Sequence, residues 1–260
     1  SAAASSPAGA LRAPMRMGAP FAPRAQRVGA RTSSGLGVAE ALASEPSPID
    51  LAAGPLRFVA GDSAGAEAYE AFIFRTAGVP TRDNLHDLFN GLAWLRFPRA
   101  KRRLNELQAA EIARAGIGAT RGPLRDALTL FDENGAVLEA PAALWEALLA
   151  RDWQRLFVTR RDLWRDARLQ VFGHALLEKL AAPRKAATAH VLVAPGASPS
   201  LGPDDTRIAA ALDPAWLATK PFVPLPVLGV PGWWTPNEAP AFYDDPFVFR
   251  SPRPRREISF

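Results

Sequence analysis

Residues 80–98 read PTRDNLHDLFNGLAWLRFP, and this stretch decides how the middle of the chain folds. The turn at residues 80–83 can cap a helix, and apolar side chains then recur at helical spacing over residues 84–95. Pro98 breaks the pattern, because proline does not fit inside a helix. A second helix is predicted over residues 99–115. The stretch therefore predicts two helices that meet at a sharp corner.

Working outward from this corner, the strongest local prediction is a β-hairpin. Residues 127–131 and 136–138 flank Asp132-Glu133-Asn134-Gly135, and Asn-Gly favours a tight hairpin turn. Helices are predicted over residues 66–76, 141–150, 152–165 and 168–180, and strands over residues 56–59 and 188–193. Beyond residue 195 the chain is too rich in proline to be helical, and its aromatic side chains predict an extended segment that covers the core.

Length and composition predict one folded domain. The chain has 260 residues, 48% of them hydrophobic and 22% charged, which is typical of globular proteins. We expect a single α+β domain over residues 49–250, in which helices pack on a small, largely antiparallel sheet wrapped by the C-terminal segment. Residues 1–48 are assigned to a low-complexity basic tail and residues 251–260 to a second basic tail. The absence of cysteine excludes thiol nucleophiles, cysteine-based zinc sites and iron–sulfur clusters.

The basic character of the chain belongs to its ends. The net charge is +5, and residues 1–48 and 249–260 each carry +3, so the domain body is close to neutral. Nucleic-acid association is therefore expected only through the tails, since a nucleic-acid-binding domain gathers its charge on a folded face. No apolar run is long enough to cross a membrane. We expect a cytoplasmic protein, although the acid-poor, arginine-rich start is also typical of a transit peptide.

The helix over residues 84–95 carries the first candidate site. His86 is flanked by Asp87, which can hold one tautomer of the imidazole. His86 is the candidate general base or metal ligand and Asp87 its orienting carboxylate. Lys101 or Arg125 is the candidate holder of an oxyanion or phosphate. A buried structural network of hydrogen bonds is the competing interpretation of these polar residues.

The other two histidines suggest a divalent metal ion as cofactor. His174 and Glu178 are four residues apart on a predicted helix, a spacing that lets both contact one ion, and His190 lies on a later strand. The candidate ligands are His86, His174, Glu178 and His190. The hypothesis of a hydrolase-like or metal-assisted enzyme requires the three imidazoles to converge.

Two further functions are weighed against this one. A non-enzymatic binding or scaffold domain would use the aromatic C-terminal surface around Trp233 and Trp234. A serine hydrolase is suggested by Gly61-Asp62-Ser63-Ala64-Gly65, which matches the G-x-S-x-G elbow. The elbow is the weaker interpretation, because a hydrolase of that fold places several strands before it and too few residues precede Ser63.

Five long motifs also carry a resemblance to a known family. They are PTRDNLHDLFN (80–90), WLRFPRAK (94–101), RGPLRDALTLFDENG (121–135), FGHALLEK (172–179) and PLPVLGVPGWW (224–234). Together they resemble a bacterial family known only as domain of unknown function 3025, over nearly all of residues 55–250. No activity is established for that family. The resemblance implies a shared polar pocket or buried network that includes the three histidines and excludes residues 61–65.

Overall fold

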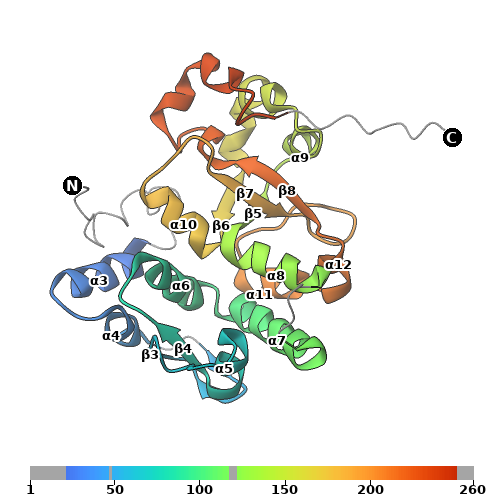
Figure 1. Cartoon of the computed structure of the whole chain (residues 1–260). Helices are drawn as coiled ribbons and strands as arrows, with labels where there is room; N and C mark the ends of the chain where they lie inside the picture. Colours follow the sequence, from blue (N-terminus) through green and yellow to red (C-terminus); the bar gives the residue numbers. More distant parts are fainter. Residues whose placement is uncertain (1–21, 47–48, 117–121, 251–260) are drawn as a thin grey trace.

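The computed structural model describes residues 22–46, 49–116 and 122–250, which form helices around a small central sheet (Figure 1). This confirms the predicted α+β class. Among these residues, no helix is long and apolar enough to cross a membrane.

The central sheet has four strands in the order β6 (Arg168–Val171), β5 (Gly135–Glu139), β7 (Thr188–Leu192) and β8 (Phe222–Pro226). Strand β5 runs antiparallel to β6 and parallel to β7, and β7 runs antiparallel to β8. The sheet is therefore largely antiparallel, as predicted. Pro224 and Pro226 lie on the edge strand β8, where a missing N–H is tolerated and a further strand cannot easily add.

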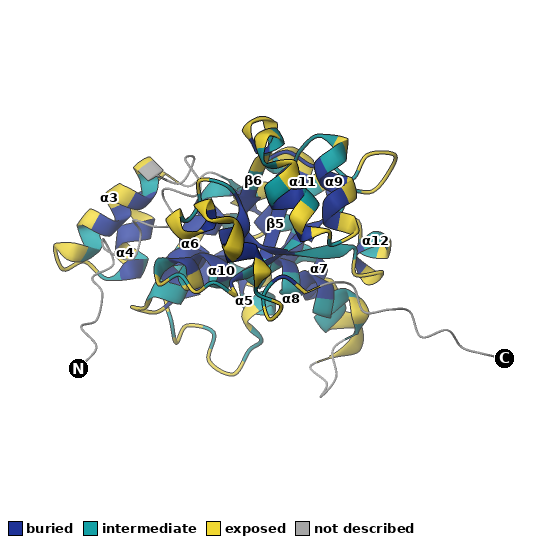
Figure 2. Ribbon diagram, turned by 90° about the horizontal axis from the view of Figure 1, so that it is seen from above, coloured by how far each residue is buried: buried dark blue, intermediate teal, exposed yellow. Residues whose placement is uncertain are grey.

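Helices pack on this sheet and bury its side chains (Figure 2). Helix α8 (Pro123–Asn134) contacts β5 and β7, and α9 (Ala142–Leu149) contacts β8. The ring of Phe131 on α8 stacks on Phe172 at 4.5 Å between centroids, and both side chains are fully buried. The core thus joins α8, which carries acidic residues at its end, to the turn that follows β6.

The corner predicted at Pro98 is present. Helix α6 (Leu85–Arg96) ends at Phe97, and α7 (Pro98–Ala115) begins with the proline at its first position, where its missing N–H costs nothing. Helix α6 packs against α10 (His174–Ala181) and α4 (Val38–Ala43), and its residues 87–95 are all buried. A side chain at Gly91 would collide with Leu42 of α4, so glycine permits this close packing.

Two smaller sheets form from residues that precede α6 in the chain. Strands β1 (Asp50–Leu51) and β2 (Gly54–Pro55) pair antiparallel, while β3 (Arg57–Ala60) and β4 (Gly78–Thr81) pair in parallel through α5 (Tyr69–Thr76). Ile73 of α5 packs with Val79 and Trp94 in a second hydrophobic cluster. Helix α5 also contacts α7, so its polar residues reach the interior between α6 and α7.

The predicted hairpin over residues 127–138 is wrong. Residues 123–134 form helix α8, and only residues 135–139 form a strand. Leu124, Ala127, Leu128 and Phe131 recur at helical spacing and pack against the core, which outweighs the local preference of Asn-Gly for a turn. Gly135 has an ordinary negative φ of −71°, so no turn with positive φ forms there.

Three other segments differ from their predictions. Residues 155–159 form a π-helix and residues 161–166 a 3₁₀ helix, because these turns stack Phe157 with Trp153 and Trp164. Residues 168–171 form β6 rather than the start of a helix, since pairing with β5 satisfies their backbone. Helices α11 (Asp205–Ala211) and α12 (Pro214–Ala218) form in the segment predicted to be non-helical, where Asp204 and Asp213 cap them.

Residues 22–46, assigned to a tail from their composition, fold against the domain. Helices α3 (Ala22–Ser33) and α4 bury Ala25, Val28 and Leu42 in the main core. Small alanine and valine side chains are enough for this contact. The low aromatic content on which the tail prediction rested therefore does not exclude folding. Residues 1–21 and 251–260, the remainder of the predicted tails, lie outside the described residues. The division into one domain over residues 49–250 stays a prediction.

Candidate metal centre

His86 lies in the first turn of α6, whose start is fixed by polar contacts. The side chain of the N-cap residue Asn84 accepts a hydrogen bond from the backbone N–H of Asp87 (2.8 Å). The Asp87 carboxylate accepts bonds from the backbone N–H (2.6 Å) and Nε (3.0 Å) of Arg82. Burial opposes ionisation of Asp87, but Arg82 outweighs it and holds the pKa of that carboxyl below its ordinary value. Asp87 therefore anchors the helix start.

His174 is the first residue of α10 and is brought to the end of α8 by a glycine. A side chain at Gly173 would lie 2.5 Å from the backbone of Glu133 and Asn134, so only glycine lets the two helix ends approach so closely. The backbone N–H groups of Phe172 and Gly173 both donate to the carbonyl of Gly135 (2.9 Å). The Phe-Gly-His sequence thus supplies a core ring, a close approach and a functional side chain in three successive residues.

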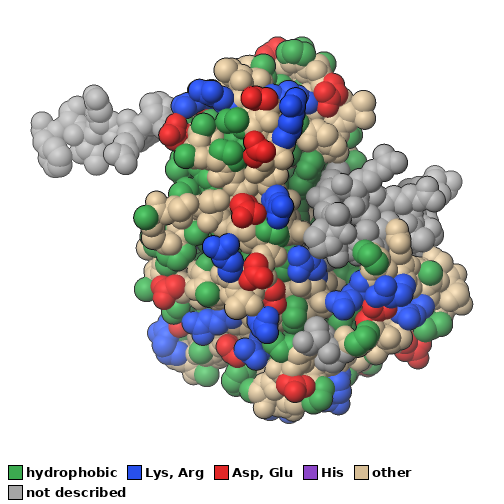
Figure 3. Space-filling view, turned by 180° about the vertical axis from the view of Figure 1, so that it is seen from behind, with side chains coloured by type: hydrophobic (Ala, Val, Ile, Leu, Met, Phe, Trp, Pro, Cys, Tyr) green, Lys and Arg blue, Asp and Glu red, His purple; other side chains and the backbone are tan. Residues whose placement is uncertain are grey.

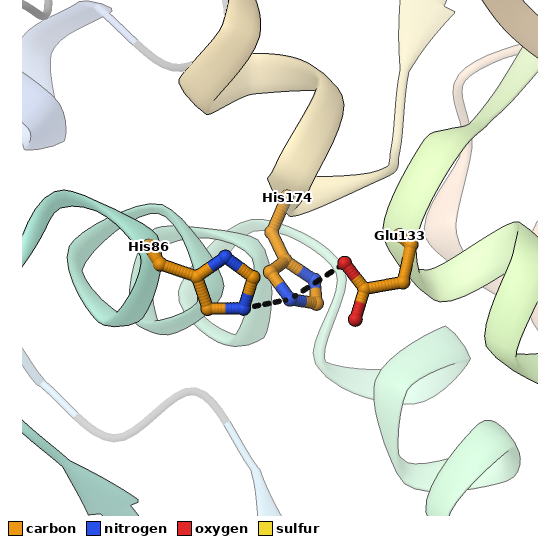
Figure 4. Close-up of side chains that lie close together, drawn as sticks. All are labelled: His86, Glu133 and His174. Carbon is orange, nitrogen blue, oxygen red and sulfur yellow. Dashed lines mark hydrogen bonds and ion pairs between the residues drawn. The ribbon is translucent and has the colours of Figure 1, made fainter.

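His86, His174 and Glu133 point toward one another from three different helices (Figure 4). The two Nε2 atoms of the imidazoles are 3.1 Å apart, and Nε2 of His174 is 3.6 Å from Oε2 of Glu133. Two ligand atoms of one tetrahedral zinc ion are separated by roughly 3.3 Å, given metal–nitrogen bonds of about 2.0–2.1 Å. The three side chains therefore have the spacing of a set of metal ligands.

Each imidazole faces a second carboxylate through its other ring nitrogen. Nδ1 of His86 lies 3.1 Å from Oε2 of Glu178, the residue predicted to be a ligand. Nδ1 of His174 is buried without a hydrogen-bond partner and lies 3.8 Å from Oδ2 of Asp132. Glu178 is thus placed to orient His86, the role that the sequence predicted for Asp87. Such an outer carboxylate is typical of metal-binding histidines.

The buried position of His174 keeps it neutral. Burial lowers the pKa of His174 to about 4, and the neighbouring charge of Asp132 only partly offsets this effect. A neutral imidazole has a free lone pair, which is the form that binds a metal ion. Burial and the neighbouring Asp132 together raise the pKa of Glu133, and the nearby charges of Lys101 and Lys179 only partly offset this effect.

A buried network of hydrogen bonds leads from Asp132, next to His174, into the interior between α6 and α7. Nζ of Lys101 donates to Oδ1 of Asp132 (2.6 Å) and to Oδ1 of Asn90 (2.9 Å), whose amide in turn donates to the hydroxyl of Tyr69 (2.8 Å). Burial raises the pKa of Glu70, which is bonded to Asn105 at 2.6 Å. Although burial opposes ionisation of Asp132, Lys101 outweighs it and holds the pKa of that carboxyl below its ordinary value. Lys101 thus acts on His174 through Asp132 and is placed to neutralise a carboxylate rather than hold a substrate oxyanion.

Two predicted residues lie elsewhere. Arg125 is in the first turn of α8 and contacts the carbonyl of Gly116 at the end of α7, seven residues along the helix from Asp132. This separation corresponds to roughly 10 Å along the helix axis. His190 is half-buried on β7 opposite Gly135 and is not part of the group formed by His86, His174 and Glu133. The structure therefore brings two of the three imidazoles into this group.

Ser63 does not occupy a nucleophile elbow. Strand β3 ends at Ala60 and α5 begins only at Tyr69, so a run of exposed turns separates the strand from the helix. The backbone N–H of Ser63 donates to the carbonyl of Ala60 within one of these turns. A strand that passes directly into a helix, which the elbow requires, is absent at this position.

The sequence analysis missed Glu133 and Asp132 as site residues. Both were placed in the turn of the incorrect hairpin, where acidic residues have an ordinary explanation. As the last turn of α8 they face the start of α10 instead. The available signal was their place in the motif TLFDENG, next to the motif FGHALLEK that contains His174 and Glu178.

The chain belongs to the family described as a protein of unknown function, DUF3025, which it matches over residues 56–253. The match includes every residue of the histidine cluster and its supporting network, and it begins after α3 and α4. No curated protein and no solved structure shows a match to the chain.

The C-terminal aromatic surface is only partly exposed. Trp233 and Trp234 are half-buried against the main core, and Phe242, Tyr243 and Phe249 are buried within it. Phe247, by contrast, is 81% exposed. Most of the aromatic surface thus covers the core, and a scaffold role through the tryptophans stays a prediction.

The arginines of the N-terminal segment are engaged within the protein. Arg24, Arg27 and Arg31 all pair with the buried carboxylate of Glu45. On the face shown in Figure 3, basic and acidic side chains are interspersed rather than gathered into a basic stripe. Nucleic-acid binding through the tails stays a prediction, and three of its expected arginines already have a structural partner.

Proposed function

We propose that this protein is a mononuclear metal-dependent enzyme in which His86, His174 and Glu133 hold a divalent cation. The observation that carries the proposal is the arrangement around the two imidazoles. Their Nε2 atoms meet at 3.1 Å, while each Nδ1 faces a carboxylate, Glu178 at 3.1 Å and Asp132 at 3.8 Å. A proton on each Nδ1 leaves both Nε2 lone pairs directed at one point beside Glu133.

A hydrogen bond between the imidazoles fits these contacts less well. It needs a proton on one of the two Nε2 atoms. If His174 carried that proton, its unprotonated Nδ1 would present a lone pair to the carboxylate of Asp132. If His86 carried it, the lone pair would instead face Glu178. For two neutral imidazoles, a lone pair opposes a carboxylate in either case, whereas a cation between the Nε2 atoms removes this conflict.

The ligand set supports hydrolytic chemistry. Two histidines and a glutamate leave part of the coordination sphere of zinc open, which is typical of catalytic rather than structural sites. A divalent cation at such a position polarises a carbonyl oxygen and lowers the pKa of water. In hydrolysis of an ester or amide there, the water oxygen would add to the carbonyl carbon, the bond from that carbon to the leaving oxygen or nitrogen would break, and the leaving group would take up a proton from that water.

The position of His86 supports access of a substrate. Its side chain is 37% exposed, whereas that of His174 is 5% exposed, so the open side of the ligand set lies toward His86. Glu178 is also exposed by 40% and borders the same side. A substrate therefore approaches over the first turn of α6 and meets the ligand set from solvent.

Metal analysis of the purified full-length chain tests the proposal. We expect one equivalent of Zn²⁺ or another divalent ion, loss of that ion on treatment with a chelator, and intense visible absorption after reconstitution with Co²⁺, as for a tetrahedral site. His86→Ala and His174→Ala should each abolish the Co²⁺ bands. His190→Ala is the matched control and should keep them. Protein that binds no Co²⁺ at micromolar concentration, or that loses binding equally in all three variants, contradicts the proposal.

The Co²⁺ spectrum and the metal preference of the same purified protein also indicate which class of reaction the site supports. An octahedral Co²⁺ spectrum with preference for Fe²⁺ would point to the oxygen chemistry of sites with two histidines and one carboxylate, and hydrolysis would then be excluded as the main activity.

We also keep a cytoplasmic location as part of the proposal, and cell fractionation tests it.

A further inference from the structure

A cavity of about 390 Å³ lies beside the first turn of α6, between this helix and the loop that joins α3 to α4. Its walls are mainly apolar and include Leu36, Val38, Leu85 and Leu88. The volume is within the usual range for small-molecule sites, and an apolar lining with few polar groups is typical of them. Leu36 is 40% exposed, so part of this apolar wall is in contact with solvent.

The cavity and the proposed metal site share the first turn of α6 but lie on different sides of it. Leu85 lines the cavity and the next residue is the ligand His86, and successive helix residues point about 100° apart. Helix α6 contacts α4 on one side and α10 on the other, and Figure 1 shows it between α10 and the α3–α4 pair. A ligand in the cavity would therefore have to extend around the start of α6 to reach the exposed edge of His86.

The charges near the cavity select the kind of ligand. Asp83 is the one charged residue among those that line it, and the backbone N–H of Val38 donates to one of its oxygens (2.7 Å). On the far side of the turn stand Glu178 and Glu133, while Arg82 is paired with Asp87. In the metal-free protein, the carboxylates of Asp83, Glu178 and Glu133 disfavour a carboxylate or phosphate group on the ligand.

We infer that this cavity is the substrate pocket of the proposed enzyme, and that it takes the compact aliphatic group of an uncharged ester or amide. The inference rests on the proposed function, because the carbonyl of that substrate is placed toward His86 and the metal site. Gly35 and Gly37, which line the pocket, come from the α3–α4 loop, which precedes the family match at residue 56. The matched domain therefore supplies the ligand set, and the added helix pair supplies one wall of the pocket.

Hexanamide is the probe that tests the pocket, because it joins a neutral amide to a short aliphatic chain. Titrated into metal-free, ¹⁵N-labelled full-length protein, it should shift the backbone amide signals of residues 35–38 and 84–88 and saturate. Leu36→Trp, which fills the pocket, and Leu36→Ser, which makes its wall polar, should each weaken binding at least about tenfold. Leu149→Trp is the matched control, because Leu149 is 51% exposed on α9, away from α6, and should leave binding unchanged. Hexanoate should bind the metal-free protein more weakly than hexanamide.

A second measurement separates the pocket from the metal site. In Co²⁺-loaded protein, the paramagnetic ion should relax the protons next to the amide of bound hexanamide more strongly than those of its terminal methyl group. Signal shifts at the cavity without this gradient, in protein shown to bind Co²⁺, overturn the inference and leave the metal proposal intact. Absence of shifts at residues 35–38 and 84–88 overturns it as well. Shifts in protein that binds no Co²⁺ overturn the metal proposal, and the catalytic role of the pocket falls with it.

Discussion

Two clusters of charged side chains lie on opposite sides of α6, and they are built on opposite principles. In the N-terminal cluster, three arginines of α3 surround the single buried carboxylate of Glu45. In the histidine cluster, Glu133, Glu178 and Asp132 surround two imidazoles, and Lys101 is the cation bonded to Asp132. The first has an excess of cations around a satisfied anion. The second has an excess of anions and a buried nitrogen, Nδ1 of His174, without a hydrogen-bond partner.

We interpret this difference as that between a structural cluster and the proposed metal-binding one. A charge cluster that only holds two helices together is expected to satisfy its buried groups, as Glu45 is satisfied by its arginines. A cluster that leaves carboxylates close together and uncompensated costs stability, and such a cost is typical of sites that bind a ligand. In the proposed function, a divalent cation held by His86, His174 and Glu133 supplies positive charge to this acidic cluster.

The largest expected effect is a loss of stability when Lys101, which is bonded to Asp132 beside the histidine cluster, is replaced. Lys101→Met removes the cation that neutralises buried Asp132, so the free energy of unfolding should fall by about 3–5 kcal/mol, the usual cost of an unpaired buried charge. Urea denaturation at constant m-value measures the change. Lys220→Met is the control, since the exposed pair of Lys220 with Asp126 should contribute less than about 1 kcal/mol. In the double variant Lys101→Met/Asp132→Asn most of the loss should be restored. If the two lysine variants lost equal stability, Lys101 would not be supporting Asp132.

The second effect concerns the carboxylate that orients His86. Glu178→Gln keeps the size of the side chain but removes the charge next to Nδ1, so the affinity for Co²⁺ or Zn²⁺ should fall about 10- to 100-fold. Competition with a chromophoric chelator measures this affinity. Glu146→Gln is the control, because Glu146 is exposed on α9 and pairs with Arg155, away from the histidine cluster. An unchanged metal affinity in Glu178→Gln would show that Glu178 is a surface partner of His86 and no more.

The sequence predicted the helices that carry this site better than it predicted the residues that form it. The α6–α7 corner follows from local signals, the turn at residues 80–83 before the helix and the proline at position 98, although the N-cap of α6 is Asn84, the residue after that turn. The spacing of His174 and Glu178 correctly placed both on one face of α10, although Glu178 contacts His86 instead of sharing a metal with His174.

The other features of the site depend on contacts between distant parts of the chain, and no local sequence pattern contains these contacts. Glu133 was missed because the turn preference of Asn-Gly concealed a helix whose apolar face is needed by the core. The approach of α10 to α8 requires the absence of a side chain at Gly173, which is visible only when both helices are in place. His190 could not be separated from the other two histidines, because its strand pairing sets its position.

The third prediction uses the charge imbalance of the histidine cluster directly. Glu133→Gln removes one of the neighbouring carboxylates, so it should raise the melting temperature of chelator-treated protein by about 2–4 °C, an increment of roughly 1 kcal/mol for a chain of this size. The same variant should lose metal affinity, so added Zn²⁺ should stabilise the wild type and leave the variant unchanged. Scanning calorimetry with and without Zn²⁺ gives both values. Destabilisation of the chelated variant would place Glu133 among the structural groups.

The smallest effect tests the N-terminal cluster, where the sign with pH is fixed by Glu45. The hydrogen bond from Arg27 lowers the pKa of Glu45 to about 2, so its carboxylate stabilises the folded state fully above its ordinary pKa near 4.5. Glu45→Gln should lower the melting temperature by about 2 °C near neutral pH, because the arginine partners are partly exposed and the pairs are screened. As pH falls from about 5 toward 2, the difference between wild type and variant should shrink to zero, because protonated glutamate and glutamine are then equivalent. Metal affinity should be equal in the two proteins throughout, since Glu45 lies outside the ligand set. A difference that persisted below pH 2, or a change in metal affinity, would show that the two clusters are coupled across α6 rather than independent.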